Sequence, residues 1–189
     1  TGLTTIDLSP LSNMYEVYAS FLAGCCGLKS IDLTPLSGVE MVHGAFLEGC
    51  SGLTSIDLGP LSQITEIQWS FLAGCRGLKS IDLGPLSKVE SIDPSFLQWC
   101  VGLTSIDLSP LSQVTRVQGA FLKGCTGLKE IDLNPLSKVT SISPSFLEGC
   151  TGLTTVDLRP LIHIEEITTD LEISGNMSTT VILPAHLQH

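Results

Sequence analysis

The sequence predicts a repeat solenoid, that is, a curved, mostly β, right-handed superhelix with one face of parallel strands. A Gly-Leu pair recurs every 25 residues, beginning at Gly2, Gly27, Gly52, Gly77, Gly102, Gly127 and Gly152. Each interval also repeats one phrase, for example "GLTSIDLGPLSQITEIQWSFLAGC" over residues 52–75. A strict period of about 20 to 50 residues is typical of units that cannot bury their own apolar face and therefore stack on their neighbours.

The first half of each unit predicts a short strand with one buried side. In "LTSIDL", the LxxLxL spacing directs Leu53, Ile56 and Leu58 into the interior. Asp57 then points the other way, toward the concave side of the solenoid. Pro60 follows, and because proline offers no N–H to a ladder, the strand is expected to end there.

The second half of each unit predicts the opposite wall of the same core. In the third unit its apolar residues are Ile64, Ile67, Phe71, Leu72 and Cys75. The equivalents of Phe71 in the next two units, Phe96 and Phe121, are expected to be buried in the same way. Periodicity does not decide whether this half is strand or irregular turn.

The two ends of the array differ. Residues 1–167 form about seven units, and the seventh loses the "FLxGC" ending after Ile167. Residues 168–189 are therefore expected to be a C-terminal cap, because an open last unit would expose apolar side chains and unpaired backbone groups. No N-terminal cap is recognisable, so either the array continues upstream or its first unit meets a partner.

The alternation of an "LxxIxL" segment with a "VxxIxxxFLxGC" segment over residues 2–167 resembles the BspA-like class of leucine-rich repeats. The unit of 25 residues is longer than is usual in that class, and "DLSPL" replaces a simpler Leu-Pro step. The resemblance implies a binding or adhesive role instead of a reaction. It also implies a surface or extracellular location, because the class occurs in surface proteins of bacteria and protists; the residues themselves leave the compartment open.

Composition excludes several classes of function. With 43% hydrophobic residues the 189-residue chain has ample material for a core, and no stretch approaches the roughly 20 apolar residues of a membrane span. A net charge of −10 disfavours nucleic acid, since no basic surface is available for phosphates. The four histidines fall at unrelated positions of the 25-residue unit; each such position is called a slot below. No CxxC and no nucleophile motif occur. We therefore predict no enzyme, no metal site and no cofactor.

Six cysteines occupy one slot, at Cys25, Cys50, Cys75, Cys100, Cys125 and Cys150. We expect them to pack as reduced, small apolar side chains, since stacked identical residues rarely present the dihedral of a disulfide. Cys26 lies outside this slot and is predicted to be the exposed, reactive thiol.

One carboxylate column is the strongest candidate site. It comprises Asp7, Asp32, Asp57, Asp82, Asp107, Asp132 and Asp157. Unit charges about 5 Å apart repel by roughly 0.8 kcal/mol even in water, and Lys29, Lys79 and Lys129 at the strand entry of alternate units offset this in part. Two interpretations remain open. The column either recognises a basic or polar protein partner, or it accepts hydrogen bonds that orient the turn before proline.

Two tryptophans are candidate interface residues. Trp69 occupies a slot that otherwise holds alanine, glycine or proline, and Trp99 replaces a glycine. Small residues in these slots suggest a tight outer turn from which a tryptophan projects, although chance substitution explains them equally well.

The sequence thus predicts a non-catalytic protein-recognition or adhesion module that uses the concave Asp/Ser/Thr/Lys face. The alternative is a structural spacer or assembly subunit inside a larger complex, held by its uncapped first unit and its tryptophans.

Overall fold

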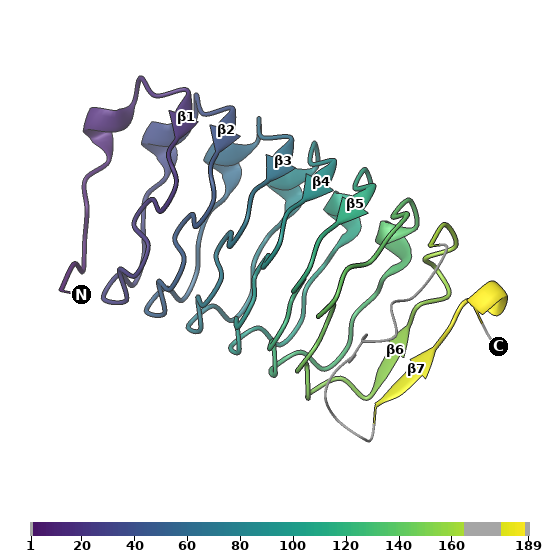
Figure 1. Ribbon diagram of the computed structural model, residues 1–189. Coiled ribbons are helices and arrows are strands. Elements are labelled where there is room, and N and C mark those ends of the chain that lie inside the picture. Colours follow the sequence, from purple (N-terminus) through teal and green to yellow (C-terminus); the bar gives the residue numbers. More distant parts are fainter. Residues whose placement is uncertain (1, 165–178, 188–189) are drawn as a thin grey trace.

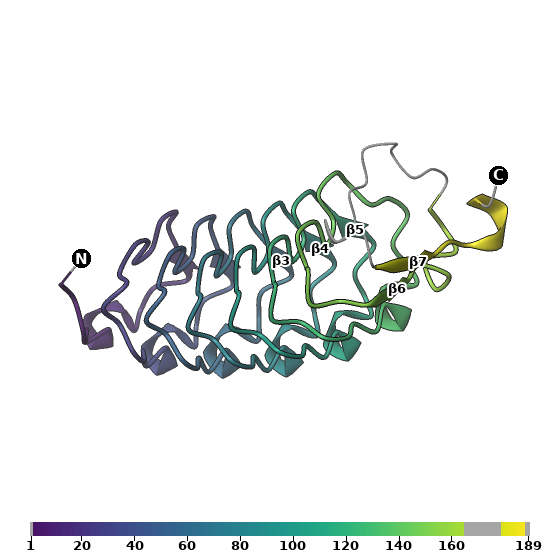
Figure 2. The same cartoon turned by 90° about the horizontal axis from the view of Figure 1, so that it is seen from below.

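The computed structural model describes residues 2–164 and 179–187. Its units follow one another as similar coils along a single axis, so the first and last units lie at opposite ends of the molecule (Figures 1 and 2). The repeat solenoid predicted from the 25-residue period is therefore confirmed. In the first six units, each coil contains a first-half wall, a 3₁₀ turn, a second-half wall and a tight turn that leads to the next unit.

The regular elements are short. The 3₁₀ turns of the first six units are η1 (Ser9–Leu11), η2 (Thr34–Leu36), η3 (Gly59–Leu61), η4 (Gly84–Leu86), η5 (Ser109–Leu111) and η6 (Asn134–Leu136). Strands in the second halves of units one to five are β1 (Glu16–Val17), β2 (Met41–Val42), β3 (Glu66–Ile67), β4 (Ser91–Ile92) and β5 (Arg116–Val117). The chain then adds β6 (Thr155–Asp157), β7 (Thr180–Ile182) and η7 (Ala185–Leu187).

The strands pair in parallel, and the register in the array equals the sequence period. Glu16 pairs with Met41 in β1 and β2, whereas Glu66, Ser91 and Arg116 align across β3, β4 and β5. Because paired residues are 25 apart, each slot of the sequence becomes a row that runs along the solenoid. A residue type repeated in one slot therefore forms a column in space.

The prediction of a strand over the "LTSIDL" segment of each unit is wrong. Within the described residues this segment is a strand only in the seventh unit, where β6 lies, and the parallel ladder otherwise runs through the second-half wall. Two first-half amides reach the neighbouring unit only over long distances, from Thr54 to the Lys29 carbonyl at 3.3 Å and from Lys129 to the Thr104 carbonyl at 3.4 Å. Pro60 also does not simply end a strand, because it lies inside η3, where its fixed φ suits the turn.

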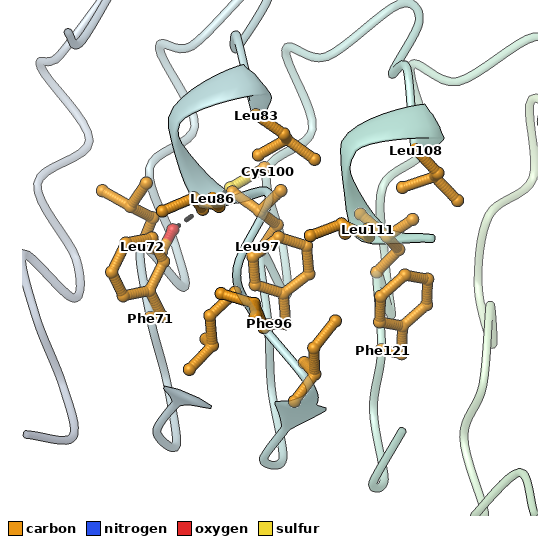
Figure 3. Packing of buried hydrophobic residues seen from close by; sticks show 14 of the residues in the cluster. Phe71, Leu72, Leu83, Leu86, Phe96, Leu97, Cys100, Leu108, Leu111 and Phe121 are labelled. Atoms are coloured by element: carbon orange, nitrogen blue, oxygen red, sulfur yellow. Dashed lines mark hydrogen bonds between the residues drawn. The ribbon is translucent and has the colours of Figure 1, made fainter. Parts of the chain in front are cut away.

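The core lies between the two walls and extends through all units. Figure 3 shows Leu83 and Leu86 of one unit packed near Phe96, Leu97 and Cys100. The phenylalanine rings form a continuous stack; Phe96 lies 6.3 Å from Phe71 and 5.6 Å from Phe121 between ring centroids. The predicted interior is confirmed for all three phenylalanines, whose exposed fraction is 1% or less.

The "SFLAG" segment is held in an unusual backbone conformation. Ser70, Leu72 and Gly74 all have positive φ, at 57°, 55° and 73°. Their amides donate alternately to the next unit and to the previous one: Ser70 to the Pro94 carbonyl at 2.8 Å, and Leu72 to the Phe46 carbonyl at 2.9 Å. A left-handed non-glycine residue costs about 1 to 2 kcal/mol. Burial of Phe71 and Leu72 and these hydrogen bonds to both neighbours offset that cost.

The glycine that opens each unit is required by close stacking. A Cβ atom at Gly102 would lie 2.5 Å from the Leu78 carbonyl oxygen and 2.6 Å from that of Arg76, both in the preceding unit. At Gly2, which has no preceding unit in this chain, no atom lies within 4 Å of that position. The glycine that defines the period therefore allows the units to approach one another.

At the C-terminal end, β7 pairs in parallel with β6 and continues the stacking direction. Val181, Leu183 and Leu187 pack against the core. The predicted boundary between array and cap, at residues 167 and 168, lies outside the described residues.

Candidate functional site

The aspartate column is held in place by one repeated hydrogen bond. In every unit the Asp Oδ1 accepts the backbone N–H of the residue two positions later, at 2.8 to 3.0 Å. The donors are Ser9, Thr34, Gly59, Gly84, Ser109, Asn134 and Arg159, each of which comes directly before proline. In the first six units this amide belongs to the first residue of the 3₁₀ turn, which has no partner inside the turn. The carboxylates therefore orient the turn, as the second interpretation of the column expected.

At Asp7, Asp32 and Asp107 these bonds also favour the ionised form of the carboxyl group. Hydrogen bonding from the side chain of Ser9 and then from its backbone lowers the pKa of Asp7, and Thr34 acts on Asp32 in the same way. Ser109 lowers the pKa of Asp107 through the same two bonds. The column is thus a row of fixed negative charges along the first-half wall, and its members in the first six units are exposed.

Asp157 differs from the others because it has a cationic partner. The guanidinium of Arg159 donates to both carboxylate oxygens, with Nη2 2.7 Å from Oδ2, and this lowers the pKa of Asp157. The last aspartate of the column is therefore neutralised within its own turn.

The three lysines predicted to offset the column, Lys29, Lys79 and Lys129, are exposed. Over residues 2–164 and 179–187, no ion pair joins any of them to an aspartate. Lysines of the second-half wall bond between units instead: Lys88 Nζ donates to Gln63 Oε1 at 2.7 Å, and Lys123 Nζ lies 2.8 Å from Glu148 Oε2. The three lysines therefore do not contact the aspartates, and any reduction of the repulsion between the carboxylates acts over a longer distance.

The first-half wall is hollowed between the fifth and sixth units. A groove of about 350 Å³ is lined by Ser105, Ile106, Glu130, Ile131 and Asp132. Glu130 occupies a slot that holds serine or threonine in the other units, so two carboxylates meet at this groove. Its lining thus combines polar side chains with two isoleucines.

The two tryptophans project from the molecule, although part of each ring packs against a neighbouring unit. Their exposed fractions are 46% for Trp69 and 44% for Trp99. The ring of Trp69 covers Gly44 of the preceding unit, and the ring of Trp99 covers Gly124 of the following one, so that neither glycine has space for a Cβ atom. Trp99 also has a φ of 60°, in the slot where glycine is otherwise found.

The cysteines are all free thiols. Five members of the column are fully buried, and each donates its S–H to a leucine carbonyl of the preceding unit, as Cys100 does to Leu72 at 3.2 Å (Figure 3). Burial raises the pKa of Cys75 to about 12 and that of Cys50 to about 11. Cys25 departs from the prediction because it is only half-buried, lacking a preceding unit to cover it, and Cys26 is exposed as expected.

The sequence interpretation missed a cluster on the second-half wall of the first two units. Tyr15, Tyr18 and Met41 have exposed fractions of 68%, 63% and 49%. The Tyr18 and His43 rings stack with their centroids 6.0 Å apart, and His43 Nε2 lies 3.2 Å from Glu16 Oε2. The available signal was variability between units, since the slots of these residues change type along the array whereas the aspartate slot does not.

Among residues 2–164 and 179–187, no group of three or more His, Cys, Asp or Glu side chains is arranged to hold a metal ion. Nor do those residues contain a helix long and apolar enough to cross a membrane.

A family model for the BspA-type leucine-rich repeat region matches residues 1–89 and 42–171, in six copies. The chain belongs to this family. The resemblance noted from the "LxxIxL" and "FLxGC" segments is therefore confirmed, and the BspA-type repeats cover nearly all of the array.

One solved structure agrees with the fold of these BspA-type repeats. A leucine-rich repeat protein from Bacteroides ovatus matches with a TM-score of 0.64 and 22% identity over 94% of this chain. This chain spans 48% of that protein's chain, about half its length. The functional domain of InlJ from Listeria monocytogenes, which includes a cysteine ladder, matches at 17% identity over 97% of this chain and 56% of its own. Its TM-score of 0.26 is too low to support a structural comparison. No curated protein sequence matches this chain significantly.

Proposed function

We propose that this BspA-type array is a non-catalytic protein-recognition or adhesion module, and that the aspartate column recognises a basic segment of its partner. The observation that carries the proposal is the fixed orientation of the carboxylates. Oδ1 of Asp57 and of Asp82 accepts one backbone amide at 2.8 Å. Across the described residues nothing bonds to Oδ2 of either side chain, so one oxygen of each carboxylate is available to a ligand.

A fixed row of carboxylates favours a cationic ligand for two reasons. Neighbouring units stack closely, so adjacent charges repel, and a bound cation removes that repulsion. The hydrogen bonds from the turn have already restricted the aspartate side chains, so little further conformational entropy is lost on binding. An extended segment with several lysine or arginine residues could contact several units at once.

The groove at Ser105 and Asp132 gives the wall a further feature that a partner could use. Its two isoleucines and two carboxylates suit a long basic side chain, which can pack its methylenes on apolar surface and pair its charge with a carboxylate. Glu130 gives this stretch of the wall a second carboxylate, although the adjacent Lys129 leaves its net charge unchanged.

The test uses a fluorescent hexalysine peptide as the probe and hexaglutamate as its anionic counterpart. Binding by the 189-residue chain is measured by fluorescence anisotropy at about 0.1 M and about 1 M salt, where the Debye length falls from about 10 Å to about 3 Å. The combined variant Asp57→Asn, Asp82→Asn and Asp107→Asn removes three charges while Asn Oδ1 can still accept the turn amide.

The matched control removes three charges from the other wall, with Glu40→Gln, Glu66→Gln and Glu90→Gln. If the column is the recognition surface, the aspartate variant loses hexalysine binding and the glutamate variant retains it. Equal losses in both variants would mean that net charge alone attracts the peptide, and the aspartate column would then have no special role.

A further inference from the structure

The outer face of the second-half wall offers a second surface with different chemistry. Residues at the outward slots before, within and after each short strand change from unit to unit. The slot of Glu16 holds, in the next five units, Met41, Glu66, Ser91, Arg116 and Ser141. A slot with a repeated structural duty keeps its residue, as the aspartate slot does. The slots that vary therefore give each unit its own surface chemistry.

The first unit concentrates aromatic surface on this face. The chain has two tyrosines, and both flank β1, at Tyr15 and Tyr18. Their exposed fractions of 68% and 63% are the largest among the exposed large hydrophobic side chains of the described residues. Met41 and Trp69 extend the exposed apolar surface into the second and third units.

A carboxylate lies between the two tyrosines. The side chain of Glu16 has an exposed fraction of only 18% and contacts His43 through Oε2. Hydrogen bonding from the Tyr18 hydroxyl, followed by that from His43, lowers the pKa of Glu16, with a smaller contribution from Tyr15. The Glu16 carboxylate is therefore ionised and is oriented by its hydrogen bonds to Tyr18 and His43.

These residues line a small, open depression. Its volume is about 220 Å³, and it is lined by Asn13, Met14, Tyr15, Glu16 and Tyr18, all from the first unit. This is room for about seven water molecules at roughly 30 Å³ each. One long side chain can displace that water and contact both tyrosines and the carboxylate.

The charge around the depression determines whether a cationic or an anionic ligand is favoured there. Residues 1–75 contain seven acidic side chains and one basic side chain, Lys29. Within the described structure, Glu40 and Glu66 on the adjoining units of this wall form no ion pair. Further along the wall a carboxylate has a cationic partner: Arg116 Nη2 lies 3.7 Å from Asp93 Oδ1.

From this arrangement we propose that the depression between Tyr15, Glu16 and Tyr18 receives an arginine or lysine side chain of a partner polypeptide. The carboxylate pairs with the cation, and the tyrosine faces add cation–π attraction. Met41 and Trp69 contact apolar residues that flank the cation. This surface is separate from the aspartate column, and it does not depend on the proposed role of that column.

The two tyrosines make the test specific, since they are the only ones in the sequence. Protein labelled with 3-fluorotyrosine gives two ¹⁹F resonances, both from this depression. The probe is the capped peptide Ala-Arg-Ala, and its neutral counterpart is the same peptide with citrulline, which keeps the shape of the side chain and removes the charge. We expect saturable shifts of both resonances with the arginine peptide and much weaker ones with the citrulline peptide.

Variants assign the contribution of each group. Tyr18→Leu is expected to weaken arginine binding about two- to fivefold, as for loss of a cation–π contact at an exposed site, with Tyr15 as the remaining reporter. Tyr18→Phe keeps the ring and should retain most of the binding. Glu16→Gln should weaken binding by a similar factor, and the exposed position of these tyrosines predicts unchanged melting temperatures for Tyr18→Leu and Tyr18→Phe.

The outcomes separate this proposal from the proposed function. The Asp57→Asn, Asp82→Asn and Asp107→Asn variant should leave the ¹⁹F titration unchanged, even if it loses hexalysine binding. Equal shifts with the arginine and citrulline peptides would show that charge is not recognised and would overturn the proposal. Shifts of the same size in Glu16→Gln as in the parent chain would also overturn it.

Discussion

The two walls of the solenoid treat their outward residues in opposite ways. The first-half wall presents an aspartate in every one of seven units, whereas the second-half wall changes its outward residues at each unit. The aspartate accepts a turn amide every time, at 2.8 to 3.0 Å, so one structural duty explains its repetition. The outward slots of β1 to β5 carry no such common bond. A residue that repeats in every unit of a solenoid is therefore first a candidate for a structural role. A position that varies between units is a candidate for determining binding specificity.

The largest effect should come from the core that both walls share. Phe96→Ala removes a ring with an exposed fraction of 0% from the middle of the stack. Such truncations cost about 3 to 5 kcal/mol of unfolding free energy, and adjacent units should lose stability as well. Urea denaturation followed by circular dichroism measures the loss. Phe21→Ala is the control, because Phe21 is only half-buried and should cost clearly less; an unchanged midpoint for Phe96→Ala would contradict the core described here.

Stacking of the units provides the next test. Gly102→Ala places a methyl group against the Leu78 and Arg76 carbonyl oxygens, and we expect a loss of about 1 to 3 kcal/mol from overpacking. Gly2→Ala occupies the equivalent slot with no atom within 4 Å and should be neutral. Thermal melts of the two variants make the comparison. Equal melting temperatures would indicate that the unit interface can yield at this point.

The structural duty of the aspartate column can be separated from its charge at Asp57. Asp57→Ala removes the acceptor of the Gly59 amide, and loss of a comparable cap costs about 1 kcal/mol. Asp57→Asn keeps an acceptor oxygen and removes one of the repelling charges, so its stability should match or slightly exceed that of the parent chain. Denaturation midpoints at neutral pH distinguish the two. If both variants lost the same stability, the charge and not the turn bond would be what the fold requires.

On the second-half wall, the two tryptophans should respond differently to glycine. Trp99→Gly relieves a left-handed conformation that costs about 1 kcal/mol or more, which offsets the lost contact with Gly124. Trp69→Gly loses its contact with Gly44 without such relief. We therefore expect Trp99→Gly to change the melting temperature less than Trp69→Gly. The opposite order would mean that the Trp99 ring holds the fifth unit in place.

The smallest effect should be a change in pH dependence at Asp107. Hydrogen bonds from Ser109 lower its native pKa below the ordinary value of 3.8 for aspartate, so the unfolded chain binds more protons in acid. The resulting stability is complete above about pH 4 and is lost as the pH falls through the native pKa. Asp107→Asn and Ser109→Ala should both lose less stability than the parent chain between neutral pH and pH 3 in urea melts. Ser112→Ala, in the same unit, should behave like the parent.

Much of this architecture was predictable because a period converts sequence into space. The 25-residue spacing, the alternation of apolar residues and the position of Phe96 require only that identical units stack in register. The same reasoning placed Cys100 in the interior and Cys26 on the surface. It also identified the aspartate column, and it gave hydrogen bonds to the turn before proline as one of two explanations for that column.

The tertiary structure decided what no single unit encodes. The ladder lies in the second-half wall, although the "LTSIDL" pattern resembles a strand, because hydrogen bonding between units depends on how their backbones meet. The positive φ of Leu72 is sustained only by bonds from neighbouring units. Tyr15, Tyr18 and Glu16 lie within four residues of one another, but sequence alone does not reveal that they line a depression. The sequence determined which residues are repeated, whereas contacts between units determined which atoms remain free to bind a partner.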